Sequence, residues 1–197
     1  MKDTCLHAFH RHWIYEVVIT AGNVDRVAVG PFGMWTDDGM TLKGSFFKGS
    51  STLQAIEAHR CFVVNPVDDP VVLHAALNRR DSLEFEFLSS GDAAGCPVLA
   101  GIPSWLAMRV THLDDTGDMV LLDAEVVGHG AIHSAPLVNR AKGLFLESLV
   151  LSTRCALIGQ AAVEQLRENV RVIAKVAPGS RYEKAVRELL ALVTESR

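Results

Sequence analysis

The chain of 197 residues is 49% hydrophobic and 21% charged, which is typical of a globular protein and excludes a disordered one. Its formal net charge of −4 disfavours a general nucleic-acid binder. The first residues lack the apolar segment of a signal peptide, and no apolar run is long enough to cross a membrane. We therefore expect a cytoplasmic protein with neither a nucleic-acid nor a membrane partner.

The first two thirds of the chain predict short strands separated by turns and by two short helices. We expect strands at residues 13–20, 26–35, 41–47, 61–64, 83–87, 105–113 and 119–127, and helices at 51–59 and 69–78. The second strand is expected to be interrupted by Gly30-Pro31. Proline cannot donate to a ladder, so this step indicates an edge, a bulge or a ligand contact.

The pattern changes near residue 136, beyond which apolar residues recur at helical spacing. Three helical segments are expected, at residues 146–157, 163–173 and 182–193. Pro178-Gly179 separates the last two, and Ser180 with Glu183 forms a capping box for the final one. We predict a mainly β, α+β fold, with a small barrel over residues 1–135 and a helical region over residues 136–197 packed on it.

The segment Lys48-Gly49-Ser50-Ser51-Thr52 stands where a predicted strand gives way to a helix. Free backbone N–H groups and the positive end of the helix dipole make such a place suitable for an anion, most commonly a phosphate. The alternative is purely structural: Ser51 caps the helix, and Gln54 completes the capping box.

Other chemistries lack their sequence patterns. No C-x-x-C pair occurs, so free thiols are expected at Cys5, Cys61, Cys96 and Cys155. The histidines at positions 7, 10 and 12 and at 129 and 133 lack a common helix or strand face, so we predict no metal site. The chain also lacks a G-x-S-x-G elbow, a G-x-G-x-x-G fingerprint and a Walker lysine.

The order of five segments resembles an uncharacterised archaeal and bacterial family within the FMN-binding split-barrel (flavin reductase-like) superfamily. The segments are Trp13–Glu16, Gly30–Gly33, Lys48–Thr52, Asn65–Pro70, and the helix from Asn139-Arg140-Ala141 to Ser152-Thr153-Arg154. The resemblance covers about residues 12–160. It implies a split β-barrel homodimer that holds FMN at or near the subunit interface.

The resemblance also implies where FMN lies. Its phosphate is expected at the strand-to-helix turn, on Lys48, Ser50, Ser51 and Thr52. Its ring is expected along the barrel strands near Gly30, Pro31, Phe32 and Gly33, although Gly30 and Phe32 replace the small residue and the methionine typical of the family. A phenylalanine there either stacks on the ring or crowds it.

Asn65 and Asp68 are candidate contacts for the flavin's pyrimidine edge or ribityl chain, because an amide both donates and accepts. The alternative is an Asx-turn that stabilises the loop. Arg140 and Arg154 lie in or beside a mostly apolar helix, and a buried arginine would need an anionic partner such as Glu147, Asp68 or a phosphate of the other subunit.

The expected function is an FMN-dependent oxidoreductase acting on a small organic or pterin-like substrate, with no catalytic residue indicated. Two alternatives remain: a flavin-binding module without turnover, and a split barrel that binds heme or a deazaflavin in place of FMN.

Overall fold

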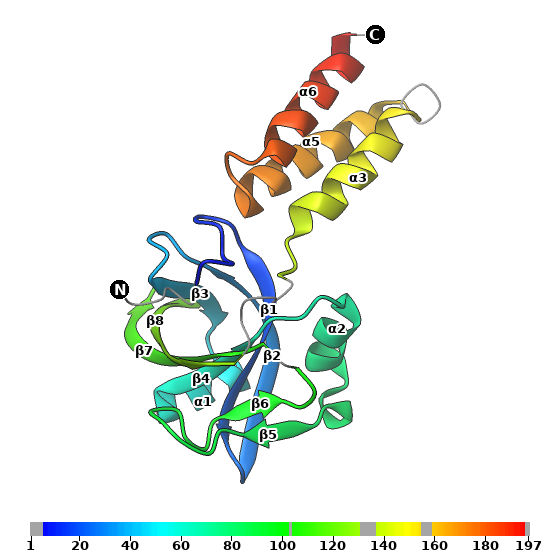
Figure 1. Ribbon diagram of the computed structural model, residues 1–197. Helices are drawn as coiled ribbons and strands as arrows, with labels where there is room; N and C mark the ends of the chain where they lie inside the picture. Colours follow the sequence, from blue (N-terminus) through cyan, green and yellow to red (C-terminus); the bar gives the residue numbers. More distant parts are fainter. Residues whose placement is uncertain (1–5, 103, 131–136, 155–158, 196–197) are drawn as a thin grey trace. The chain divides into compact units, whose positions relative to one another are not determined.

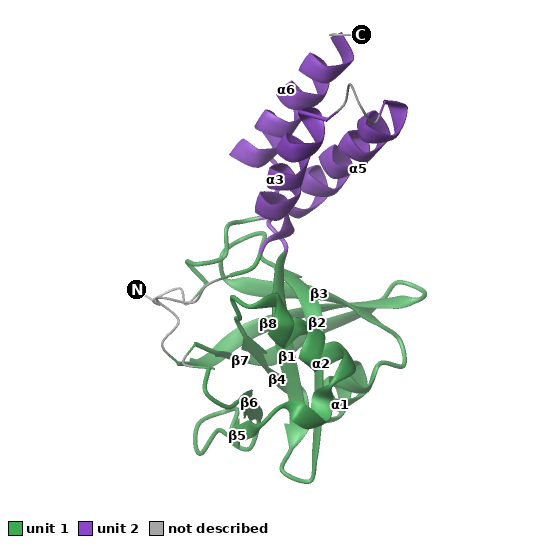
Figure 2. Ribbon diagram, turned by 90° about the vertical axis from the view of Figure 1, so that its right-hand side faces the viewer, with its two compact units in different colours: residues 1–11, 15–138 green, residues 12–14, 139–197 purple. Residues whose placement is uncertain are grey.

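The computed structural model describes residues 6–102, 104–130, 137–154 and 159–195 (Figure 1). The chain forms two compact units (Figure 2). The first comprises residues 1–11 and 15–138, and the second comprises residues 12–14 and 139–197. The second unit therefore takes a short segment from before the first strand as well as the last third of the chain.

The first unit is a closed six-stranded antiparallel barrel. The strands follow the order β1-β2-β3-β8-β7-β4 around it. Their bounds are β1 Tyr15–Asn23, β2 Arg26–Trp35, β3 Thr41–Phe47, β4 Cys61–Asn65, β7 Leu106–Asp115 and β8 Met119–His129. The predicted α+β fold with a small barrel is confirmed.

Two short helices and a small sheet lie outside the barrel: α1 Ser51–His59, α2 Pro70–Asn78, β5 Phe85–Phe87 and β6 Pro97–Leu99. Figure 1 shows α2 beside β1 and β2. Val18 and Val29 of those strands pack there with Ala76 of α2 and Leu99 of β6. Because side chains alternate along a strand, Val17 and Ile19 on either side of Val18 face the barrel interior, where both are fully buried.

Strand β2 is continuous, so the predicted interruption at Gly30-Pro31 is wrong. Gly30 pairs with Ile19 and Pro31 with Val18 across the β1–β2 ladder. On its other side β2 pairs with β3 only at Met34 and Trp35. At Pro31 the strand therefore behaves as an edge strand, where proline is tolerated.

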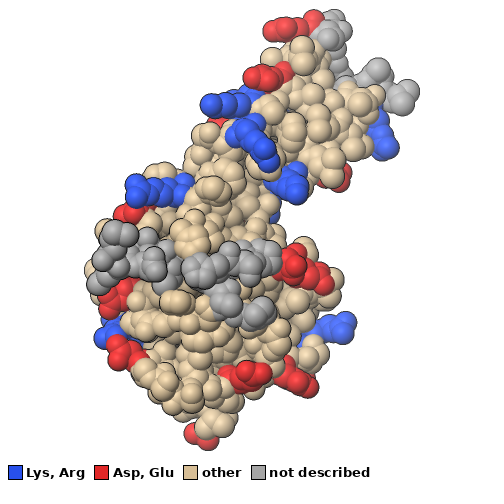
Figure 3. Space-filling view, in the orientation of Figure 1, with Lys and Arg blue, Asp and Glu red and all other residues tan. Residues whose placement is uncertain are grey.

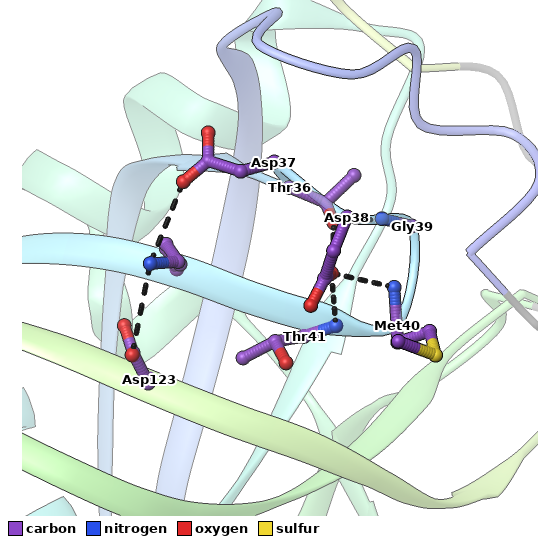
Figure 4. A network of polar contacts seen from close by, with 8 residues as sticks. Thr36, Asp37, Asp38, Gly39, Met40, Thr41 and Asp123 are labelled. Atoms are coloured by element: carbon purple, nitrogen blue, oxygen red, sulfur yellow. Dashed lines mark hydrogen bonds and ion pairs between the residues drawn. The ribbon is translucent and has the colours of Figure 1, made fainter.

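The turn from β2 to β3 is held by side chains (Figure 4). The Asp38 carboxylate accepts hydrogen bonds from the backbone N–H groups of Met40 at 2.7 Å and Thr41 at 2.8 Å. These bonds lower the pKa of Asp38 to about 2. Lys43 lies between Asp37 and Asp123, with N–O distances of 3.4 and 3.7 Å.

The second unit contains α3 Arg140–Ser152, α5 Gln160–Val176 and α6 Arg181–Glu195. Its core includes Ile173 and Val186, and Trp13 and Ile14 pack against that core. One half of the predicted Ser180–Glu183 capping box is confirmed, because Ser180 accepts from the Glu183 N–H at 3.1 Å. The Glu183 carboxylate accepts from the N–H of Gly179, one residue before the cap, at 2.7 Å.

The structure corrects one further prediction for this region, and other predictions concern residues that it does not describe. Arg140, the first residue of α3, and Arg154, just beyond its end, are both exposed, so neither is the buried arginine that would require an anion. The predicted helical segment 146–157 extends past residue 154 into residues that the structure does not describe. His133 also lies outside the described residues. No helix in the described part of the chain has the length and apolarity to cross a membrane.

Candidate functional site

The start of α1 is capped by Ser50, not by Ser51 as the structural alternative predicted. Ser50 has an extended backbone, and its hydroxyl accepts a hydrogen bond from the Leu53 N–H at 3.3 Å. Gln54 reaches back to the Gly49 carbonyl at 3.4 Å. Gly49 has a φ of +78°, which glycine adopts without strain. Capping therefore uses Ser50 and leaves the hydroxyls of Ser51 and Thr52 for other contacts.

Ser51 lies in a pocket of about 350 Å³ beside the first turn of α1. Arg80 donates from Nη1 to the Ser51 hydroxyl at 3.4 Å and from Nε to the Ala76 carbonyl at 3.2 Å. The second bond fixes the arginine against the end of α2. Arg26 and Asp81 also line the pocket, and Val29 and Phe85 contribute to its apolar surface.

The charge of this pocket is locally positive. Two arginines, Arg26 and Arg80, stand against one carboxylate, Asp81. On the face shown in Figure 3, basic side chains of the described residues are scattered over the barrel unit instead of forming a broad basic surface. The pocket is therefore a candidate site for an anion on a chain whose net charge is negative.

Thr52 brings two of the predicted segments together. It is 2% exposed, and a Cβ placed on Gly30 would lie 3.4 Å from its hydroxyl oxygen. The same Cβ would lie 3.1 Å from the Phe32 ring, so a side chain at Gly30 would be crowded. The Phe32 ring packs on Phe46, with 4.4 Å between ring centroids and an interplanar angle of 35°.

Lys48 faces a different part of the surface from Ser51. Its ammonium forms a 2.6 Å ion pair with Asp115, and its backbone N–H donates to the Asp118 carbonyl. The hydrogen bond from Lys48 lowers the pKa of Asp115. Lys48 lines a second pocket, of about 390 Å³, together with Gln54 and Asp115. The two pockets share no lining residue, so the structure separates Lys48 from Ser51.

Asn65 is fully buried, and its amide is engaged by protein groups at both ends. Its Nδ2 donates to the Thr20 hydroxyl at 3.0 Å, to the Val18 carbonyl at 3.2 Å and to the Val63 carbonyl at 3.3 Å. Its Oδ1 accepts from the Leu99 N–H at 3.0 Å. The side chain therefore joins β1, β4 and β6 and forms no Asx-turn, and the flavin contact stays a prediction.

Asp68 is exposed, and the neighbouring Asp69 caps α2 through a 2.8 Å bond from the Val71 N–H. The predicted site residues are thus not brought together at one place. Ser51 lies with Arg80, Thr52 lies with Gly30 and Phe32, and Lys48 and Asp68 lie elsewhere. Arg26 and Arg80 were missed because each is a single arginine outside any motif.

The barrel has the fold of the flavin reductase-like split-barrel proteins. The chain is similar to the FMN-bound DUF447 protein MM1853 of Methanosarcina mazei, with 22% identity and a TM-score of 0.52 over 93% of this chain and 96% of that one. It is also similar to the NADH:FAD oxidoreductase SgcE6 of Streptomyces globisporus, solved with NAD and FAD fragments, with 15% identity and a TM-score of 0.52 over 63% and 78% of the two chains. The flavin reductase PheA2 gives 18% identity and a TM-score of 0.50 over 64% and 89%.

A family model identifies the family of this chain. The chain belongs to the family described as "Protein of unknown function (DUF447) N-terminal domain", whose model matches residues 15–133. That span lies within the barrel unit. No curated protein matches the chain. The family match and the split-barrel fold therefore confirm the predicted resemblance in family and in fold.

Proposed function

We propose that this protein binds FMN and is an oxidoreductase that acts on a small organic substrate through that cofactor. The observation that carries the proposal is the pocket at the start of α1, where Arg80 and Ser51 meet beside Arg26. Guanidinium groups, a hydroxyl and free helix N–H groups are donors suited to a phosphate monoester. The FMN-bound Methanosarcina mazei protein of the same family supports the choice of ligand.

The residues that line the pocket beside Ser51 fit a flavin phosphate better than the predicted segment Lys48–Thr52. Ser51 and Arg80 would hold the phosphate, with Arg26 adding charge, and Lys48 is already paired with Asp115. The ring would lie along β2 at Gly30–Gly33, where the strand has no β3 partner in the ladder. Bound FMN would supply hydride and electron transfer, and the protein residues would bind and orient it.

A fluorescence titration with FMN and riboflavin tests the phosphate assignment. We expect FMN to bind more tightly, because each charge-assisted bond to phosphate contributes about 1.5–3 kcal/mol, equivalent to roughly 10- to 100-fold in Kd. Arg80→Ala should weaken FMN binding by about that factor and leave riboflavin binding unchanged. Ser51→Ala should weaken FMN binding less, because a neutral hydroxyl contributes about 1 kcal/mol.

Arg79→Ala is the matched control, because it removes the same charge from an adjacent exposed residue. Lys48→Ala distinguishes the two pockets and should leave FMN affinity near that of the wild type. Equal affinity for FMN and riboflavin would overturn the phosphate site. A large loss in Lys48→Ala with none in Arg80→Ala would move it to the pocket beside Asp115.

Turnover requires a separate experiment. We expect the FMN-loaded protein, photoreduced without oxygen, to pass electrons to a small acceptor such as a pterin or quinone faster than free FMN does. If no acceptor is reduced faster, the protein is a flavin-binding module without turnover. An absorption spectrum of the freshly purified protein tests the remaining alternative, since heme and deazaflavin absorb differently from FMN.

We further propose that the protein is a homodimer with FMN near the subunit interface. Several apolar side chains on α3 are exposed, among them Leu146 at 59% and Leu149 at 40%. Exposed apolar side chains of this kind favour burial against a second copy, and two-fold dimers are the commonest assembly. Sedimentation equilibrium at micromolar concentration should give twice 21.4 kDa, and a monomer mass would exclude the dimer.

A further inference from the structure

Two cysteines that are far apart in sequence lie side by side on the outside of the barrel. Cys61 is the first residue of β4, and Cys96 directly precedes β6. Cys61 packs against a buried cluster that contains Cys96 and Val63, which brings the two thiols close to each other. Cys61, Val63 and Asn65 share one face of β4 because side chains alternate along a strand.

A second set of contacts independently brings the two segments together. Asn65 binds the Leu99 N–H, and Thr20 donates to the Pro97 carbonyl at 2.5 Å. Both bonds attach β6 to the barrel immediately after Cys96. The position of Cys96 opposite Cys61 is thus fixed by the backbone of β6 as well as by the thiol contact.

The loop that ends at Cys96 is tied to the barrel beside Cys61. Arg109 is the cross-strand partner of Cys61 in the β4–β7 ladder, and it forms an ion pair with Asp92 of the loop. Both side chains of that pair are substantially exposed, so the pair adds little stability and is weakened by salt. The loop is closed at its base by the bond from the Gly95 N–H to the Leu88 carbonyl at 2.7 Å.

The two thiols have unequal access and unequal acidity. Cys96 is 1% exposed, whereas Cys61 is partly exposed. The hydrogen bond from Cys96 lowers the pKa of Cys61 to about 7, and the same bond together with burial raises the pKa of Cys96. Because the thiolate is the nucleophile in disulfide exchange, Cys61 is the thiol that attacks first near neutral pH.

We propose that Cys61 and Cys96 are a redox-active pair that forms a reversible disulfide with a small-molecule disulfide as the oxidant. The Cys61 thiolate attacks one sulfur of the oxidant, forming a mixed disulfide and releasing one thiol. The Cys96 sulfur, losing its proton, then attacks the Cys61 sulfur and releases the second thiol. Two protein thiols are oxidised to one disulfide, and the oxidant takes two electrons and two protons and leaves as two thiols.

The disulfide would clamp the loop between β5 and β6 onto β4. The loop would then be attached to the barrel by a covalent bond as well as by the exposed ion pair between Arg109 and Asp92. Salt weakens the ion pair but not the covalent bond. The same hairpin contributes Phe85 to the pocket that contains Ser51 and Arg80, so the clamp would also fix one wall of that pocket. The proposal does not depend on FMN binding.

The test uses the full chain with Cys5→Ser and Cys155→Ser, so that only the pair remains. The protein is equilibrated with reduced and oxidised glutathione in varying ratio, quenched with acid, and treated with a maleimide of large mass. We expect both thiols to be lost together as the ratio becomes oxidising, with a peptide linked through Cys61 and Cys96 in the digest. Excess reduced glutathione should restore both thiols.

Single variants define the roles of the two sulfurs. Cys96→Ser should leave Cys61 as a stable mixed disulfide with glutathione, whereas Cys61→Ser should leave the buried Cys96 largely unmodified. Protease cleavage within the loop should be at least about fivefold slower in the oxidised protein, because the clamp suppresses local opening.

The proposal is overturned if the pair protein keeps both thiols in excess oxidised glutathione, or if it stops at a mixed disulfide. It is also overturned if the only disulfide formed joins two chains. Peptide mapping of the oxidised wild-type chain gives the same decision if a single variant fails to fold.

Discussion

Replacing Asn65 separates a structural role for this residue from a cofactor role. Asn65→Ala removes the only side-chain acceptor that the structure gives the Leu99 N–H, and Leu99 is 3% exposed. A buried donor left unpaired costs about 1–3 kcal/mol. The bonds donated to Thr20 and Val18 are lost as well, each contributing about 1 kcal/mol net. We expect the free energy of unfolding to fall by about 3–5 kcal/mol.

Urea unfolding followed by tryptophan fluorescence measures this loss. With a slope of about 2 kcal/mol per molar urea, the midpoint should fall by about 1.5–2.5 M. Asp68→Ala is the matched control, because this exposed carboxylate stands in the segment that follows β4. That variant should stay within about 0.5 kcal/mol of the wild type.

Flavin titration of the same variants distinguishes the two roles. If Asn65→Ala unfolds at the wild-type urea concentration but binds FMN at least about tenfold more weakly, the amide contacts the cofactor and the strand-joining role is wrong. If it is destabilised while its folded fraction binds FMN normally, the predicted flavin contact is wrong.

Three further substitutions test the barrel and the helical unit. Gly44→Ala would place a Cβ 2.5 Å from the Met34 sulfur, so the melting temperature should fall with a loss of about 1–3 kcal/mol, and an unchanged melting temperature would contradict the packing. Asp38 has a pKa lowered to about 2 in the folded protein, so its carboxylate stabilises the fold above about pH 4 and loses that effect as the pH falls toward 2. In urea unfolding at pH 7, the free energy of unfolding of the wild type should therefore exceed that of Asp38→Asn by less than about 1 kcal/mol, and the two values should converge as the pH falls to 2. A difference that persists at pH 2 would refute the titration. Ser180→Ala removes the cap of α6 and should cost about 1 kcal/mol in thermal unfolding, whereas no change would show that Glu183 alone holds the turn.

Local signals explain which elements the sequence predicts well. The helix at Ser51–His59 and the strand at Thr41–Phe47 have the predicted bounds, because a cap, a turn and alternation mark them within a few residues. Strand β2 was predicted with a break because proline disrupts most ladders. Whether Pro31 faces a partner strand depends on how far β3 follows β2, and this is a tertiary property. The three residues of β6 were missed because they pair only with the equally short β5.

The candidate site was predicted only where its residues are neighbours in sequence. Of the hydroxyls at 50–52 only Ser51 lines this pocket, and Arg26 and Arg80 come from separate segments that the packing of α2 on β2 brings together. Cys61 and Cys96 were treated as widely spaced free thiols, since sequence spacing carries no information about contacts across a sheet. Asn65 joins strands because its amide is buried, and an exposed amide would be available to a ligand. Its contact with β6, and not its own segment, determines that burial.

The small segment before β1 has a consequence for the order in which the protein assembles during synthesis. Trp13 and Ile14 belong to the core of the helical unit, and the Ile14 N–H donates to the Val176 carbonyl at 2.9 Å. They leave the ribosome before the barrel, whereas Val176 and Val186 leave it after the barrel. The barrel has all of its strands once β8 is made, but the helical core must wait for α6 while its first two residues stay without their partners. Cleavage after Val138 would therefore not release an intact helical unit, because the fragment would lack Trp13 and Ile14.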